Sequence, residues 1–152
     1  MIFKVHPMPR IQLKPAPRYP FATDIQIYIS HVNQGGHLDN AQLLTLVSEA
    51  RVRFFNSLGY FESGVDGAHI VVGDLVAQYK SEGFHGETML VEMAPGDFNK
   101  YGFDLQFRMR EKTTLREVAL GKIGIVFITR ADRKVRLIPQ AFMNKLQQAG
   151  ML

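Results

Sequence analysis

One segment of this chain has the apolar spacing of a long amphipathic helix, and segments with the character of strands lie on both sides of it. At 100° per residue, one face of this segment carries only apolar side chains: Leu43, Val47, Ala50, Phe54 and Leu58. Asp39 or Asn40 is suited to begin the helix, because either side chain can accept hydrogen bonds from the free amides of a first turn. Gly59 is suited to end it. We therefore expect a single helix of roughly 18 residues.

The remaining sequence is dominated by patterns typical of β-strands. Alternating apolar and polar residues predict strands over 24–30, 69–81, 88–94, 101–110 and 116–129. The stretch Ile123–Ile128 is apolar on both faces, which predicts a central strand covered on both sides. A short amphipathic tail containing Phe142, Met143 and Leu146 predicts a closing helix. This order predicts an α+β domain with one long central helix packed against a single curved antiparallel sheet of about five strands.

The chain of 152 residues suits one domain preceded by an extended arm. Residues 1–22 contain five prolines and predict the arm, and residues 23–152 form the expected domain. We expect no membrane span, because no apolar stretch approaches the roughly 20 residues of a membrane helix. The start does not resemble a signal peptide, so we expect a cytoplasmic protein. One helix cannot cover five strands completely, and we therefore expect a homodimer or homotetramer.

Composition excludes several classes of function. The absence of cysteine excludes disulfide scaffolds, thiol nucleophiles and metal sites that use cysteine. Scattered histidines predict no metal site, and the lack of phosphate-loop, dinucleotide-binding and serine-elbow motifs predicts no cofactor. The net charge of +4 is spread along the chain, so we expect no nucleic-acid partner. The densest basic cluster (Arg130, Arg133, Lys134 and Arg136) is either a solvated turn or a site for a phosphorylated ligand.

The stretch from Ile29 to Asn40, which continues into Ser48–Phe55 and Leu58-Gly59, resembles a known family. It is similar to the hot-dog-fold acyl-CoA thioesterases of the 4-hydroxybenzoyl-CoA thioesterase type, and the resemblance covers residues 23–142. The family typically has a strand-to-helix loop with Asp and His-Val-Asn-Asn, followed by a Glu-Ala-Arg helix. The resemblance implies a hot-dog fold. It also implies hydrolysis of an acyl thioester of coenzyme A or acyl carrier protein to a carboxylic acid and a free thiol.

Two positions depart from the family pattern. The usual catalytic Asp falls on Asn33, and an Asn of the motif falls on Asp39. Because an amide cannot act as a general base, either Asp39 or Glu49 supplies the carboxylate, or the chain is a non-catalytic acyl-thioester-binding or structural hot-dog protein. An enoyl-thioester hydratase is a weaker alternative. His37-Leu38-Asp39 matches its His-x-Asp ending, but the preceding Asp-x-Asn is absent.

The resemblance and the local chemistry together give a set of candidate site residues. The predicted catalytic residues are Asn33, His37, Asp39 and Glu49, and the predicted substrate-binding residues are Gly35, Gly36, Asn40, Arg130 and Arg133. The amides of Gly36 and His37 would polarise the thioester carbonyl near the start of the helix. Glycine at positions 35 and 36 would let the backbone approach a ligand closely. The side chain of Asn33 would hydrogen-bond the thioester or a water molecule.

Most of these residues also have a structural interpretation. Asp39 can be the helix cap, His37 can be tied to the backbone, and Asn33 can simply form a turn. Glu49 has Arg53 four residues later, the spacing of a surface ion pair.

Overall fold

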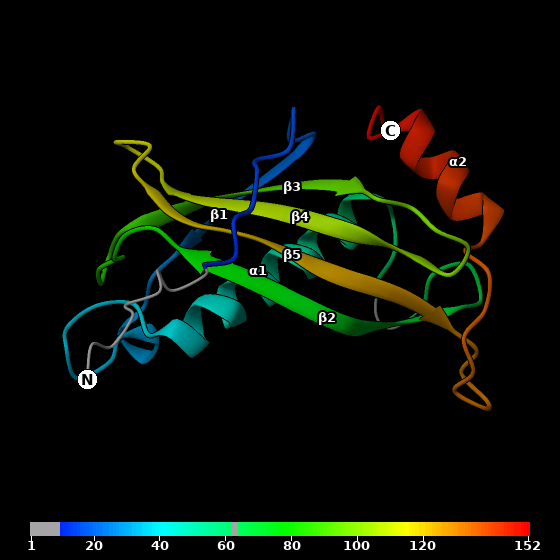
Figure 1. Cartoon of the computed structure of the whole chain (residues 1–152), viewed down its shortest axis with the longest axis horizontal. Helices are drawn as coiled ribbons and strands as arrows, with labels where there is room; N and C mark the ends of the chain where they lie inside the picture. The colour runs from blue at the N-terminus through cyan, green and yellow to red at the C-terminus, as the bar shows by residue number, and fades with distance from the viewer. Residues whose placement is uncertain (1–9, 62–63) are drawn as a thin grey trace, which may run out of the picture.

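A curved five-stranded antiparallel sheet wraps around one long helix in the computed structural model, which describes residues 10–61 and 64–152 (Figure 1). The elements in chain order are β1 (Phe21–Gln26), a short 3-10 helix (Ile29–His31), α1 (Asn40–Ser57), β2 (His69–Tyr79), β3 (Thr88–Gly96), β4 (Gly102–Glu111), β5 (Glu117–Ile128) and α2 (Gln140–Gln148). This is the α+β hot-dog architecture that the sequence predicts.

The central helix agrees closely with its prediction. Asp39 caps α1, because its Oδ2 accepts hydrogen bonds from the amides of Ala41 and Gln42. Gly59 follows the helix with a φ of +85°, a conformation that favours glycine. The predicted apolar face is buried and also includes Leu46.

The first strand differs from its predicted bounds. It begins at Phe21, inside the predicted arm, and ends at Gln26. The prediction that it continues to Ser30 is wrong, because the chain turns at Ile29 into the 3-10 helix. Ile29 continues the apolar alternation of Ile25 and Ile27, yet it is 72% exposed.

The strand order in the sheet is β1-β3-β4-β5-β2. All four pairings are antiparallel, and β2 pairs with β5 although β3 follows it in the sequence. The strand β5 lies between β4 and β2, which confirms the interior position predicted for Ile123–Ile128. Two edges result, one formed by β1 and the other by β2.

The core lies between α1 and the concave face of the sheet, and α2 closes one end of it (Figure 1). Phe142 of α2 is fully buried. Its ring lies 5.4–6.1 Å from four other aromatic rings, those of Phe55, Tyr60, Phe103 and Phe127. The predicted closing helix is thus anchored in the same core as α1.

Residues 1–9 of the predicted arm lie outside the described residues, and its part from Arg10 to Pro20 crosses the face of the sheet opposite α1 (Figure 1). The guanidinium of Arg108 lies 4.6 Å from the centre of the Tyr19 ring, and Arg108 is also paired with Glu92. Arg18 donates hydrogen bonds to the carbonyls of Gly150 and Leu152. These contacts hold the described part of the arm against β4 and against the C-terminal segment. Among the described residues, no helix is long and apolar enough to cross a membrane.

Candidate functional site

The loop before α1 is closed by its own backbone hydrogen bonds. The Asn33 amide donates to the carbonyl of His37, and the Gly36 amide donates to the carbonyl of Asn33, both at 3.0 Å. Gly36 has a φ of +82°, which this turn requires and which favours glycine. The Asp39 amide donates to the carbonyl of His31, at 2.9 Å. The loop therefore presents its side chains from a fixed backbone.

A cavity of about 350 Å³ opens between this loop, the first turn of α1 and the segment that follows β2. It brings together polar side chains and an apolar surface to which Leu43 and Val118 contribute. The complete lining is Asn33, His37, Leu38, Asn40, Leu43, Tyr79, Lys80, Ser81, Glu82, Gly83 and Val118. A cavity with a mostly apolar surface and a few convergent polar groups is typical of a small-molecule site.

Asn33 and His37 lie close together at this cavity. A Cβ atom at Gly35 would lie 3.2 Å from both Asn33 Oδ1 and His37 Nε2. Asn33 Oδ1 is buried, and no described group donates a hydrogen bond to it. Buried polar atoms are nearly always satisfied in native proteins. This oxygen is therefore a candidate to accept a hydrogen bond from a water molecule or a ligand at the cavity.

The imidazole of His37 lies between a backbone carbonyl and a carboxylate. Its Nδ1 is 3.3 Å from the carbonyl oxygen of Leu38, and its Nε2 is 3.7 Å from Oε1 of Glu82. The hydroxyl of Tyr79, another residue at the cavity, donates to the carbonyl of Asn40, at 3.0 Å, which joins the end of β2 to the start of α1.

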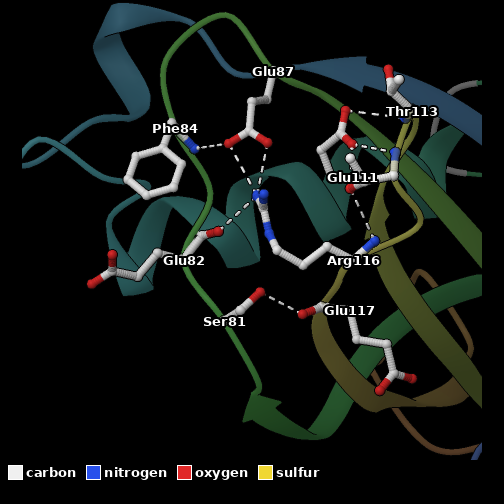
Figure 2. Close-up of polar contacts among 9 residues, drawn as sticks. Ser81, Glu82, Phe84, Glu87, Glu111, Thr113, Arg116 and Glu117 are labelled. Atoms are coloured by element: carbon white, nitrogen blue, oxygen red, sulfur yellow. Dashed lines mark hydrogen bonds and ion pairs between the residues drawn. The ribbon is translucent and has the colours of Figure 1, made fainter.

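The segment that carries Glu82 is held by Arg116 (Figure 2). Arg116 Nη2 donates to the carbonyl of Glu82, at 3.0 Å, and to both carboxylate oxygens of Glu87, at 2.7 and 3.1 Å. On the neighbouring turn, Glu111 accepts hydrogen bonds from the hydroxyl and amide of Thr114 and from the amide of Thr113, and these bonds lower its pKa to about 2.

Two predicted catalytic carboxylates have structural contacts instead of lining the cavity. Asp39 satisfies the first amides of α1, as described above. Glu49 Oε1 accepts a hydrogen bond from Arg53 Nε at 2.7 Å, and Arg53 also donates to the Asp24 carbonyl. Arg53 thereby ties α1 to β1. The helix-cap and ion-pair interpretations therefore describe the contacts of both residues.

The predicted substrate-binding residues are only partly brought together. Asn40 lines the cavity, and Gly35 packs against Asn33 and His37. The Gly36 amide is engaged by the carbonyl of Asn33, so it is not free to polarise a carbonyl as predicted.

Val118, near the start of β5, lines the cavity, whereas Arg130 and Arg133 come after the other end of this strand. Ten residues of strand span roughly 33 Å. Within one chain these two arginines are therefore remote from the cavity.

The sequence interpretation missed Tyr79, Lys80 and Glu82. They come from the end of β2 and the segment after it, which the long strand pairing brings next to the loop before α1. A weak signal was present, because Ser81-Glu82-Gly83 is a polar break directly after a strand. Nothing local in the sequence places that break beside His37.

Comparison with known proteins agrees with this architecture. Residues 27–146 match the family model of the thioesterase-like superfamily. No curated protein matches the chain. One similar solved structure is Slr0204 of Synechocystis, a 1,4-dihydroxy-2-naphthoyl-CoA thioesterase, with a TM-score of 0.76 and 16% identity over 84% of this chain and 95% of the other. Another is SAV2348 of Staphylococcus aureus in complex with CoA, with a TM-score of 0.77 and 14% identity over 85% and 82% of the two chains. The family match covers most of the chain and the fold agrees with it, so the chain belongs to the thioesterase-like superfamily.

Proposed function

We propose that this chain hydrolyses an acyl thioester of coenzyme A in the cavity beside His37. The observation that carries the proposal is the convergence of Asn33 and His37 on a cavity of about 350 Å³ that also has an apolar surface. That volume is within the range of small-molecule sites. The apolar residues Leu38, Leu43 and Val118 would hold the acyl group, with the thioester next to the polar loop.

The backbone amide of His37 is our candidate to polarise the thioester carbonyl. Among the described residues, nothing accepts a hydrogen bond from this amide, whereas the Gly36 amide and the capped amides of α1 are engaged. A fixed amide directed at a developing oxyanion stabilises the transition state. The amide side chain of Asn33 would hydrogen-bond the thioester or the attacking water.

Lys80 and the basic turn after β5 are candidates for binding the phosphates of coenzyme A. Lys80 lines the cavity in the same chain. Arg130 and Arg133 would reach it only from a second copy. The outer edge of β2 pairs with no other described strand, and Val72 and Tyr79 on β2 are 43% and 48% exposed.

A two-fold axis at this edge would pair β2 antiparallel with its copy. The Tyr79 end of one strand would then lie beside the His69 end of the other. His69 pairs with Ile128, immediately before the basic turn. A homodimer of this kind would bring the partner's Arg130 and Arg133 close to the cavity. The open edge of β2 therefore supports an oligomer that is at least dimeric. We also propose a cytoplasmic location.

The first test is release of free thiol from a panel of acyl-CoAs by the purified chain, with His37→Ala beside it. We expect turnover by the wild type and its loss in the variant. Binding of acyl-CoA without turnover on any chain length would instead identify a non-catalytic binder. Activity on acyl-carrier-protein thioesters alone would refute coenzyme A as the carrier.

The dimer has a separate test. We expect light scattering to give at least twice the mass of the chain, and Arg130→Ser with Arg133→Ser to raise KM for acyl-CoA while kcat is kept. Lys14→Ser, an exposed cation on the arm, is the matched control. A monomeric active enzyme would contradict the shared site.

A further inference from the structure

Glu82 is a better candidate for the catalytic carboxylate than Asp39 or Glu49, the two residues that the sequence suggests. Glu82 and His37 both line the cavity, and Oε1 of Glu82 lies 3.7 Å from Nε2 of His37. This separation is too long for a direct hydrogen bond. The two atoms instead form a pair of facing groups at the mouth of the proposed thioester site.

The contact on the other side of the ring determines what Nε2 can do. Nδ1 of His37 faces the carbonyl oxygen of Leu38, which can only accept a hydrogen bond. A neutral imidazole therefore carries its hydrogen on Nδ1 and presents a lone pair at Nε2. Nε2 and the Glu82 carboxylate are then two acceptors 3.7 Å apart.

Two acceptors at this separation are suited to one water molecule. A water donates two hydrogen bonds of about 2.8–2.9 Å, so a single water can direct one O–H to Nε2 and the other to Oε1. Its lone pairs then face away from both bases, which leaves them free to attack a carbonyl carbon. The carboxylate of Glu82 points away from the Arg116 side chain and is therefore available for this role (Figure 2).

The backbone around Glu82 is fixed by contacts on both sides. The Leu38 amide donates to the carbonyl of Gly83 at 2.7 Å, and Arg116 binds the carbonyl of Glu82 itself. Ser81 Oγ donates to the carbonyl of Glu117 at 2.5 Å. Gly83 lies so close to the core that a Cβ there would be 2.9 Å from Ile27 Cδ1. The backbone position of Glu82 relative to the loop of His37 is thus set by packed structure, while the Glu82 side chain is 60% exposed.

From this geometry we infer that Glu82 and His37 together hold and deprotonate the water that hydrolyses the thioester, an inference that rests on the proposed function. The water oxygen forms a bond to the thioester carbonyl carbon, and its proton passes to His37 Nε2. The Glu82 carboxylate accepts the second O–H and stabilises the imidazolium. When the tetrahedral intermediate breaks its C–S bond, the imidazolium returns the proton to the leaving thiolate. The products are a carboxylic acid and a free thiol.

The test uses the full chain and the acyl-CoA that it hydrolyses best in the panel. We expect Glu82→Gln to lower kcat by about 10²–10⁴-fold, the usual contribution of a general base, with KM within about threefold of wild type. Glu82→Asp should recover part of this loss. The pH profile of kcat should change in Glu82→Gln, because the variant has one ionisable group fewer beside the attacking water.

Glu117→Gln is the matched control, because Glu117 is an exposed carboxylate on the same surface whose side chain points away from the cluster (Figure 2). It should keep kcat within about twofold. Equal thermal midpoints in all variants would show that they are folded. If Glu82→Gln keeps kcat and its pH profile while His37→Ala is inactive, the role of Glu82 is refuted and the thioesterase proposal stands. If the wild type hydrolyses no thioester, both proposals are refuted.

Discussion

Replacing Asn33 with alanine tests whether this loop residue serves the cavity or the fold. Its Oδ1 is buried without a donor among the described residues. A buried carbonyl oxygen in that state costs about 1–3 kcal/mol. The substitution removes this cost together with some packing at the edge of an existing cavity. We therefore expect the free energy of unfolding to change by less than about 1 kcal/mol.

Asp39→Ala is the matched comparison, because Asp39 is a polar residue of the same loop whose hydrogen bonds are structural. The substitution removes bonds of 2.9 and 3.2 Å to the amides of Ala41 and Gln42. Loss of a helix N-cap costs about 1 kcal/mol, within a range of about 0.5–2 kcal/mol. Asp39→Ala should therefore lower stability and keep most of the activity.

The effects on activity should be reversed, with a larger loss in Asn33→Ala than in Asp39→Ala. Loss of one hydrogen-bonding group at the reacting atoms lowers kcat by about 10²–10³-fold, and we expect a loss of that order in Asn33→Ala. Urea denaturation and thiol release measure the two quantities on the same preparations. If Asn33→Ala loses more than about 2 kcal/mol of stability, or if folded Asp39→Ala is inactive, the division between the two residues is wrong.

Three further predictions concern the fold. Phe142→Ala should lower the free energy of unfolding in urea by about 3–5 kcal/mol, because it empties the centre of the aromatic core. Leu137 is 62% exposed, so Leu137→Ala should lower it by less than about 0.5 kcal/mol. Gly102→Ala should destabilise the chain by at least about 1–3 kcal/mol, because its Cβ would lie 1.9 Å from the Ile125 carbonyl oxygen. Gly96→Ala is the control, since a Cβ at Gly96 meets its nearest atom at 3.8 Å. An unchanged thermal midpoint in Gly102→Ala would contradict the clash. Glu111 has a pKa lowered from 4.5 to about 2 in the folded chain, so its contribution to stability is present above pH 4.5 and is lost as the pH falls toward 2. Denaturation of Glu111→Gln at pH 7, 4.5 and 3 should show a smaller dependence on pH than the wild type.

The features that the sequence predicts well depend on neighbouring residues. The apolar stripe, the Asp39 cap and the stop at Gly59 all lie within α1 or directly beside it. The loop from Asn33 to His37 is likewise one continuous segment, so its side chains meet at the cavity without help from distant contacts.

The features that it predicts poorly depend on long-range pairing. The strand alternation of β2 does not say that its partner is β5 instead of β3. Glu82 lies beside His37 only because the segment after β2 forms a bridge at Phe84 with the loop before α1. The cluster around Arg130 and Arg133 is visible in the sequence, but its distance from the cavity depends on the length and course of β5.

The pairing of β2 with β5 also has a consequence for how the chain is made. His69 pairs with Ile128 and Tyr79 with Ala119, so β2 leaves the ribosome 40 to 59 residues before its partner. At 5–20 residues per second, this delay is roughly 2–12 s. During that time β2 is an apolar strand with two open edges, next to a helix that has no complete sheet to cover it. The nascent chain therefore exposes more unpaired strand edge than the folded one, and the synthesis of β5 covers one of the two edges of β2.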